Sequence, residues 1–257
     1  MQSRDNKYQA PALEKGLAIL EYLSSQSIPQ SQTEIAAGIG RSQNEIYRML
    51  ISLEHTGYIL REEVSGKYRL SLKLYYLSHH HSIVDELRRA ALNAMEGLAD
   101  SIKEACHLSI IYRSKLMVIT HVKSPAPIAL SIEEGSLFPL ILTASGRVLL
   151  AYSTNEVKDN LLSNSQSYQT FDKARREELN VLLHDISQRG HYIMQSDLAE
   201  GVTDIAVPII HPNTGIVACL TVSKLTKFNI DINVDNKRIL REIEHAVHEI
   251  LKKIGFA

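Results

Sequence analysis

One short stretch of the chain concentrates the kinds of side chain that contact nucleic acids. Amide groups pair with adenine edges, and guanidinium groups pair with guanine edges or with phosphate. The stretch lies between residues 41 and 48, where the expected DNA-contacting residues are Arg41, Ser42, Gln43, Asn44, Tyr47 and Arg48. An ordinary solvated helix surface is the alternative explanation. The secondary structure predicted around the stretch favours one of these explanations, DNA contact or an ordinary solvated surface.

Two sequence patterns typical of helix N-termini lie in and just before this stretch. Ser31 with Glu34, and Ser42 with Glu45, each form the S-x-x-E pattern of a capping box. In a capping box the two side chains satisfy backbone N–H groups that have no partner at the start of a helix. The capping role also explains why Glu45, a carboxylate that phosphate would repel, stands among the basic residues.

The second of these helices is amphipathic. Between residues 43 and 55 the apolar side chains recur at helical spacing, and those expected to point inward are Ile46, Met49, Leu50 and Leu53. The polar and basic residues lie on or near the other side. Gly38 and Gly40 let the chain turn tightly between the two helices. The pattern predicts a helix-turn-helix whose second helix faces DNA.

A short hairpin follows the helix-turn-helix. After residue 57 the chain alternates in polarity, turns at Ser65-Gly66 and alternates again, which predicts the antiparallel wing of a winged helix-turn-helix. Its basic residues can reach phosphate without adding sequence preference, and they are Arg61, Lys67 and Arg69. Because Glu62 and Glu63 oppose such contact, we expect only one or two of them to touch DNA.

Flanking helices set the domain boundary. Residues 12–24 predict an amphipathic helix that packs across the helix-turn-helix, with an apolar side made of Leu13, Leu17 and Leu20, joined by Ile19 and Leu23. Helices predicted at about residues 72–81 and 83–102 follow and connect the two domains. We expect one domain at residues 1–78 and a second at 79–257, entered through residues of about 72–102. The apolar faces of the connecting helices either pack on their own domains or mediate dimerisation.

The second domain alternates strands with helices. Strand patterns occupy residues 106–112, 116–121, 192–195, 203–210 and 216–223. Helix patterns occupy residues 144–152, 155–162, 173–189 and 234–254. This order predicts an α+β fold around an antiparallel sheet.

One helix start in the second domain has the chemistry to hold an anion. Ala144, Ser145 and Gly146 are small residues that open the helix at 144–152, so that its first N–H groups and its dipole would favour a carboxylate. Thr221 and Ser223 alternate along one strand, which turns both hydroxyl groups to the same face. Solvated strand hydroxyls are the alternative for this pair.

Several segments carry a family resemblance, and in chain order they are Ala12–Glu21, Ile46–Leu50, Gly57-Tyr58, Gly66–Leu70, Thr143–Ala151, Arg189–Tyr192, Glu200–Val202, Ile205–Pro208 and Gly215–Ala218. In these segments, and over nearly its whole length, the chain resembles the IclR family of bacterial transcription regulators. The resemblance implies a winged helix-turn-helix, a connecting helix and a C-terminal GAF- or profilin-like effector domain. It also implies a homodimer or homotetramer that binds double-stranded operator DNA. The effector pocket that it implies consists of Ala144, Ser145, Gly146, Gln195, Asp204, Thr221 and Ser223.

Two of these pocket positions differ from the pattern of better-known family members. By the resemblance, members that bind small oxo acids have an uncharged residue at the position of Asp204 and a carboxylate at that of Gln195. A carboxylate at Asp204 would accept hydrogen bonds from hydroxyl groups but repel a bare acid. We therefore expect a small organic acid of the sugar-acid type, with its carboxylate at residues 144–146 and its hydroxyls at Asp204. Alternatively, Asp204 faces solvent or caps a turn.

The composition argues against several other classes of protein. The formal net charge is −1, so DNA affinity must come from a local basic surface and not from the whole molecule. The first residues are polar and no apolar run reaches about eighteen residues, so we expect a cytoplasmic protein without membrane contact. Cys106 and Cys219 lie in apolar runs and are expected to be buried. The histidines of residues 79–81 would point about 100° apart on a helix, so we expect no metal and no cofactor.

Two other function classes remain as alternatives. An enzyme is disfavoured because the chain has no G-x-S-x-G, H-E-x-x-H or P-loop motif, and because Cys106 and His107 would point to opposite faces of a strand. A winged-helix adaptor that binds protein in place of DNA is disfavoured by the polar and basic helix face. We expect a ligand-responsive, DNA-binding regulator of a catabolic operon, with no catalytic residues.

Overall fold

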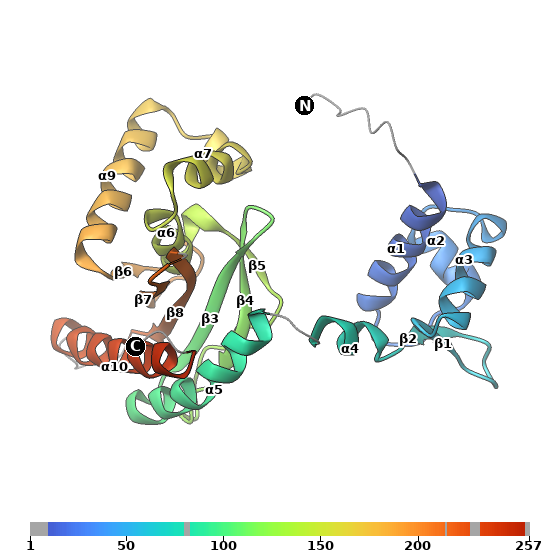
Figure 1. The fold of residues 1–257 in the computed structure, drawn as a ribbon, viewed down its shortest axis with the longest axis horizontal. Coiled ribbons are helices and arrows are strands. Elements are labelled where there is room, and N and C mark those ends of the chain that lie inside the picture. Colours follow the sequence, from blue (N-terminus) through green and yellow to red (C-terminus); the bar gives the residue numbers. More distant parts are fainter. Residues whose placement is uncertain (1–9, 80–82, 214, 227–231, 255–257) are drawn as a thin grey trace. The chain divides into compact units, whose positions relative to one another are not determined.

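The computed structural model describes residues 10–79, 83–213, 215–226 and 232–254. The chain forms two compact units, residues 1–82 and 83–257, each with its own core (Figure 1). Among the described residues, no helix combines the length and the apolar character needed to cross a membrane.

The first unit is a winged helix-turn-helix. Its elements are α1 (Pro11–Ser24), α2 (Gln32–Gly38), α3 (Gln43–His55), β1 (Ile59–Arg61), β2 (Tyr68–Leu70) and α4 (Lys73–His79). Both predicted capping boxes are present, at Ser31 and at Ser42, and α3 begins and ends where the sequence predicts. The core gathers apolar side chains of α1, α2, α3 and β1, namely Ile19, Leu23, Ile35, Ile46, Leu50 and Ile59.

The predicted inward face of α1 is wrong in part. Leu13 and Leu17 are 62% and 50% exposed, whereas Ile19 and Leu23 are buried and Gly16 lies against the core side. The apolar stripe that contains Leu13 and Leu17 and the adjacent one that contains Ile19 and Leu23 both follow the helical period. Periodicity alone therefore does not predict which stripe is buried. Packing against α3 selects the stripe that contains Ile19.

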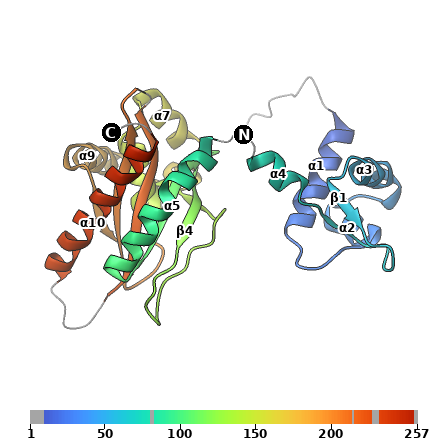
Figure 2. The same ribbon diagram turned by 60° about the horizontal axis from the view of Figure 1, so that its bottom comes forward.

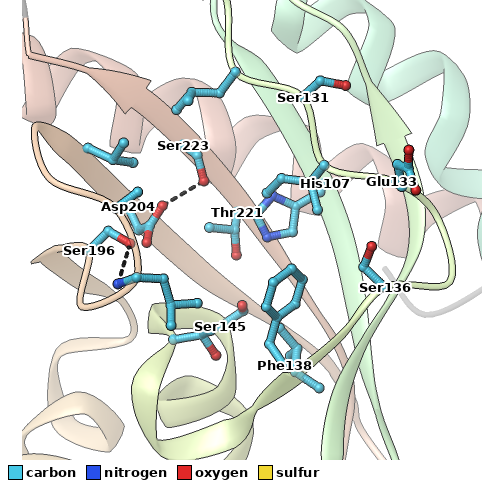
Figure 3. A pocket seen from close by; sticks show the side chains of 17 residues that line it. His107, Ser131, Glu133, Ser136, Phe138, Ser145, Ser196, Asp204, Thr221 and Ser223 are labelled. Carbon is cyan, nitrogen blue, oxygen red and sulfur yellow. Dashed lines mark hydrogen bonds between the residues drawn. The ribbon is translucent and has the colours of Figure 1, made fainter.

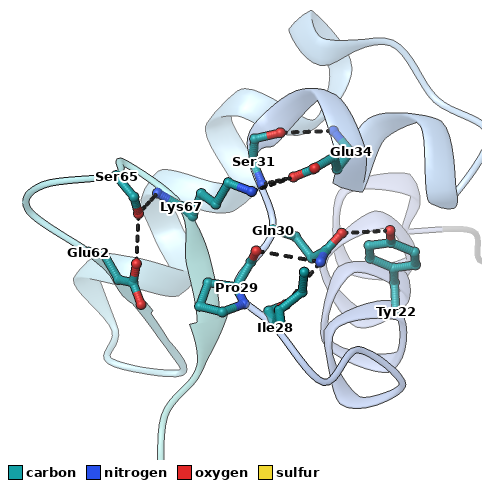
Figure 4. Close-up of polar contacts among 9 residues, drawn as sticks. All are labelled: Tyr22, Ile28, Pro29, Gln30, Ser31, Glu34, Glu62, Ser65 and Lys67. Atoms are coloured by element: carbon teal, nitrogen blue, oxygen red, sulfur yellow. Dashed lines mark hydrogen bonds and ion pairs between the residues drawn. The ribbon is translucent and has the colours of Figure 1, made fainter.

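Gln30, in the loop before α2, attaches that loop to the wing, a connection that the sequence did not predict. Figure 4 shows the contacts of its side chain with Tyr22, Ile28 and Pro29. Its backbone forms an isolated antiparallel bridge with Tyr68, with N–H to carbonyl distances of 2.8 and 2.7 Å. Its side chain is buried, accepts a hydrogen bond from the Tyr22 hydroxyl at 3.1 Å and donates to the Ile28 carbonyl at 2.9 Å. The wing is therefore held by a third extended segment as well as by its own turn.

The second unit is built on a six-stranded antiparallel sheet of order β5-β4-β3-β8-β7-β6. The strands are β3 (Ala105–Tyr112), β4 (Lys115–Val122), β5 (Leu137–Pro139), β6 (Tyr192–Gln195), β7 (Val202–His211) and β8 (Gly215–Leu225). The helices are α5 (Ile83–Ile102), α6 (Ala144–Ala151), α7 (Asn155–Ser163), α8 (Gln166–Gln169), α9 (Lys173–Arg189) and α10 (Ile232–Lys253), with a 3-10 turn at Leu140–Leu142. The predicted α+β class is confirmed.

Different helices pack on the two faces of the sheet. Helices α5 and α10 lie side by side on one face, where Met95 and Ile243 pack with sheet residues such as Leu220 (Figure 2). On the other face α6 and α9 form a second core with Ala206 and Cys219. Because side chains alternate along a strand, strands such as β7 and β8 supply both cores.

Three short elements were not predicted, and each is brief for a physical reason. Strand β5 has three residues and ends in a proline that cannot donate to a ladder. Helix α8 has four residues and the 3-10 turn has three, which is too short for an apolar pattern to repeat. The first of these matters most, because β5 borders the pocket described next.

Candidate DNA-contacting surface and ligand pocket

The start of α3 is fixed by hydrogen bonds and by an ion pair. The Ser42 N–H donates to Glu45 Oε2 at 3.0 Å, and Lys15 of α1 lies 3.0 Å from Glu45 Oε1. The hydrogen bond from the Ser42 backbone, with help from Lys15, lowers the pKa of Glu45 to about 2. Glu45 is thus ionised and engaged in capping, as the sequence predicts, and the orientation of α3 is tied to α1.

The polar face of α3 is open. Arg41, Ser42, Gln43, Asn44, Tyr47 and Arg48 are all exposed. The Gln43 side-chain amide donates to Thr33 Oγ1 at 3.0 Å, which restrains that side chain. Within the described part of the chain, the side chains of Arg41, Asn44 and Arg48 form neither ion pairs nor hydrogen bonds. The structure therefore brings the predicted residues together on one accessible helix face.

The basic residues of the wing differ in how freely they can move. Arg61 folds back, donating to the Gly66 carbonyl at 3.2 Å and lying over the Tyr68 ring. Lys67 lies 3.5 Å from Glu34 Oε2 (Figure 4). Arg69 is exposed beside Leu60. Arg69 is thus the wing side chain with the fewest constraints.

The second unit contains a pocket of about 500 Å³ on the sheet face that carries α6 (Figure 3). Its lining is His107, Leu116, Leu130, Ser131, Ile132, Glu133, Ser136, Phe138, Thr143, Ser145, Ser196, Leu198, Ala199, Val202, Asp204, Thr221 and Ser223. Strands β3 and β8 form the floor, and the start of β7 with the loops before β5 and after β6 forms the walls. A cavity of this size accommodates a small organic molecule.

Asp204 lies in the wall of the pocket. It accepts a hydrogen bond of 2.6 Å from the Ser223 hydroxyl, to which the register of β7 and β8 pairs it. Burial raises the pKa of Asp204, while hydrogen bonds from Ser223 and Ser196 act in the opposite direction. Asp204 is the third residue of β7, is paired with Ser223 in the ladder and faces the cavity, so it neither caps a turn nor faces open solvent.

His107 is a pocket residue that sequence reasoning missed. It pairs with Thr221 across β3 and β8, and both side chains reach the cavity. Burial lowers the pKa of His107 to about 4, with a smaller contribution from His121, so the imidazole is neutral near pH 7. Strand alternation places His107 on the face opposite Cys106, but only the pairing of β3 with β8 brings it beside Thr221, so the sequence carried no direct signal for its place in the pocket.

Three of the residues predicted for the pocket do not line it. Gln195 pairs with Thr203, and its side chain donates to Thr203 Oγ1 at 3.0 Å. Paired residues of antiparallel strands share a face, and Thr203 faces away from its neighbour Asp204, so Gln195 is on the opposite face of the sheet. The Ala144 side chain is buried in the core under α6.

Gly146 is the third of these residues, and it is needed for close packing. A Cβ at this position would overlap the carbonyl oxygen of Leu140. Its N–H donates to Thr143 Oγ1 at 3.1 Å, which is the cap of α6. The helix start presents Thr143 and Ser145 to the pocket, so the predicted anion site is reached through these two residues.

The charged side chains of the lining are both acidic. Asp204 and Glu133 lie at opposite sides of the pocket in this view, with His107 and Thr221 between them (Figure 3). Among the described residues, the lining contains no lysine or arginine. Such a pocket favours a ligand that donates hydrogen bonds at both ends, and it offers a negative group no positively charged side chain, only neutral donors such as Ser145 and the dipole of α6. The described residues also contain no cluster of three metal-ligating side chains.

Two family models match the chain and together cover most of it. The model of the IclR helix-turn-helix domain matches residues 12–63, and the model of the bacterial transcriptional regulator IclR C-terminal domain matches residues 79–253. Both matches fall on the units that carry the two candidate sites.

Individual relatives agree with these models. The chain is similar to the HTH-type transcriptional regulator XynR of Escherichia coli, with 27% identity over 95% of this chain and 97% of that one. The glycerol operon regulatory protein of Streptomyces coelicolor is 27% identical over 77% of this chain and 78% of its own length. An IclR homolog from Microbacterium hydrocarbonoxydans, solved with 4-hydroxybenzoate, has a TM-score of 0.78 at 19% identity and shares the fold over 95% of this chain and 98% of its own.

Proposed function

The chain belongs to the IclR family of bacterial transcriptional regulators, and from this we propose that it controls a catabolic operon by binding a palindromic operator in a ligand-dependent way. The observation that supports DNA contact best is the open face of α3, where Arg41, Asn44 and Arg48 are exposed and unpaired among the described residues. Placed in a major groove, the amide and guanidinium groups would contact base edges, while Arg69 on the wing would contact phosphate. The protein then acts in the cytoplasm, where its DNA is.

We propose that the DNA-binding form is a dimer or a dimer of dimers. The first unit exposes apolar side chains on α1 and around α4, and these are Leu13, Leu17, Leu72, Leu74, Tyr75, Tyr76 and Leu77. Exposed apolar residues in such number favour burial against another surface. A twofold dimer would set two α3 helices in successive major grooves, with half-sites related by a palindrome.

We propose that the pocket binds a small hydroxylated organic acid as effector. The carboxylate of such a ligand would approach Thr143 and Ser145 at the start of α6, and its hydroxyl groups would donate to Asp204. Two related proteins fit this class in part. The Streptomyces coelicolor relative is named for a glycerol operon, and the Microbacterium structure holds 4-hydroxybenzoate.

An uncharged polyol is the second candidate for the ligand. It is favoured by the acidic pair Asp204 and Glu133 and by the lack of lysine and arginine among the described lining residues. Hydroxyl groups can donate to both carboxylates without the cost of placing a third negative charge in the cavity. Both candidate ligands would interact with Asp204. They differ at the start of α6, where the acid would place a carboxylate and the polyol an uncharged hydroxyl group.

A thermal-shift screen tests the effector proposal. Sodium D-gluconate, 4-hydroxybenzoate, glyoxylate and glycerol represent a sugar acid, an aromatic acid, an oxo acid and a polyol. We expect a hydroxylated member to raise the melting temperature, and Asp204→Ala to weaken its binding about 10- to 150-fold, because a charge-assisted hydrogen bond contributes about 1.5–3 kcal/mol. Asp185→Ala, on the exposed surface of α9, is the control. Equal affinity of the wild type and Asp204→Ala in titration calorimetry would exclude Asp204 from the site.

A further inference from the structure

The turn before β5 has two sides that face different parts of the second unit. Glu133 and Ser136 line the pocket. Glu134, between them, does not line it and makes its contacts with β4 and α5 instead. A single turn thus touches both the ligand cavity and the helix through which the chain enters the second unit.

The contacts of Glu134 bridge two elements. Its Oε1 accepts the backbone N–H of His121 on β4 at 3.1 Å. Its Oε2 forms an ion pair of 3.0 Å with Nη2 of Arg88 on α5. The backbone of His121 belongs to the cross-strand pair with His107, which is itself in the pocket floor. One carboxylate therefore joins the turn, the edge of the sheet and α5.

Arg88 is held at several points in the second turn of α5. Its Nε donates to the buried hydroxyl of Thr120 at 3.1 Å, and its Nη1 lies 3.4 Å from Asp85. A guanidinium group with donors in a fixed planar arrangement transmits a displacement of one partner to the others. Movement of Glu134 would consequently act on the first turns of α5 and on β4.

The turn itself is compact and attached to β4. The Ser136 N–H donates to the Glu133 carbonyl at 3.2 Å, and the Gly135 N–H donates to the Val118 carbonyl at 2.7 Å. Gly135 has a positive φ of 83°, a conformation that favours glycine and closes the turn tightly. A short closed turn moves as one body, so pressure on Glu133 or Ser136 from the cavity reaches Glu134.

We propose that Arg88 and Glu134 are positioning residues that transmit occupancy of the pocket to the first turns of α5. The proposal rests on the proposed function, since it describes how the effector pocket would regulate the DNA-binding unit. In the sequence, α5 follows α4 after residues 80–82, so its first turns are the part of the second unit nearest along the chain to the winged unit. The ion pair is partly exposed, with side chains 31% and 45% accessible, so it is weak enough to be rearranged by a ligand.

Hydrogen exchange on the full chain tests this coupling without DNA or ligand. Ser131→Trp, at the exposed mouth of the pocket, and Ser136→Phe, from inside the turn, place a large side chain in the cavity as a substitute for a ligand. We expect each to change amide exchange in residues 84–92 about threefold or more. In a Glu134→Gln or Arg88→Gln background we expect the same substitutions to leave exchange in residues 84–92 at the level of that background.

Matched controls separate coupling from general loosening. Arg89→Gln neutralises the neighbouring exposed arginine of α5, and Glu96→Gln neutralises an exposed glutamate farther along the same helix. In both backgrounds the response of residues 84–92 should persist. The proposal is overturned if neither cavity-filling variant alters exchange in α5, or if the response is as large without Glu134 as with it. Because no operator or effector is present, this result is independent of whether the proposed DNA and ligand are correct.

Discussion

At the scale of single residues, burial has opposite effects on the two titratable groups of the pocket floor and wall. It raises the pKa of Asp204 and lowers that of His107, because in each case the charged form loses solvation. Ser223 and Ser196 offset part of the effect on Asp204 by donating hydrogen bonds to the carboxylate. The pocket therefore combines a carboxyl group whose loss of solvation is offset only in part by hydrogen bonds with a neutral imidazole that can both donate and accept.

The neutral state of His107 has a consequence for stability. Its pKa in the folded protein is about 4, below the value of about 6.5 for an unfolded histidine, so the unfolded chain binds the proton first as the pH falls. The contribution of His107 to stability is present above pH 6.5 and is lost progressively as the pH falls to about 4. The loss amounts to at most about 3 kcal/mol.

We expect His107→Gln to reduce this pH dependence. Denaturant unfolding of the second unit at pH 7 and pH 5 should show a smaller fall in the free energy of unfolding for the variant than for the wild type. His184→Gln, on the exposed surface of α9, should behave as the wild type. Parallel pH dependences of the wild type and His107→Gln would show that His107 is not the group involved.

The residues proposed to contact bases lead to a second prediction at this scale. Arg48→Ala and Asn44→Ala should each weaken binding to the selected operator by about 1–3 kcal/mol per half-site if the side chain contacts a base edge. Arg69→Ala removes an arginine of the wing, and it should weaken all sequences alike because phosphate contacts carry no sequence information. Fluorescence anisotropy at fixed salt provides the measurement. Unchanged operator affinity in both α3 variants would remove α3 from its role in recognition.

Both cysteines are buried and protonated. Burial raises the pKa of Cys106 and of Cys219 to about 12, so neither is a thiolate near neutral pH. Their predicted burial is confirmed. The prediction that the chain is not an enzyme agrees with the matched families, whose members are transcriptional regulators.

At the scale of elements, local signals explain what the sequence could predict. The capping boxes fixed the starts of α2 and α3, and helical periodicity with a C-terminal glycine fixed α9 at residues 173–189. What failed depended on tertiary contacts. The buried stripe of α1 is chosen by α3, and the face of Gln195 is set by its register with Thr203.

The lining of the pocket, too, could be predicted only in part from the sequence. Strand alternation predicted that the Thr221 and Ser223 hydroxyls share one face, and the family resemblance assigned them to the pocket. His107 and Glu133 were not predicted, because they come from a different strand and from the turn before β5, and only the sheet order brings them to the same cavity. Periodicity describes one element at a time, whereas a pocket is formed between elements.

A pair of glycines in helices provides a test at this scale. Gly146→Ala would force the new Cβ against the Leu140 carbonyl at the start of α6, and we expect it to destabilise the second unit by about 1–3 kcal/mol. Gly97→Ala, inside α5 and facing open space, should stabilise it by up to about 1 kcal/mol. Denaturant unfolding measures both. A stable Gly146→Ala variant would show that the α6 start has room that the structure does not contain.

At the scale of the whole molecule, affinity for an operator requires more surface than one winged unit provides. The formal net charge is −1, so binding depends on the local face of α3 and on using two such faces together. We expect the chain to be a dimer or larger at micromolar concentration before DNA is added. Sedimentation equilibrium measures the state, and a monomer at that concentration would remove the preformed dimer from the mechanism.

The most direct test of the regulator function is selection of binding sites from random duplex DNA by the full chain. We predict enrichment of a palindrome whose half-sites are separated by an integral number of turns, about 10–10.5 base pairs each. Arg48→Ala should lose preference at symmetric positions of both half-sites. Enrichment of no sequence, with equal affinity for random and selected DNA, would contradict sequence-specific binding and would favour a winged-helix adaptor that binds protein.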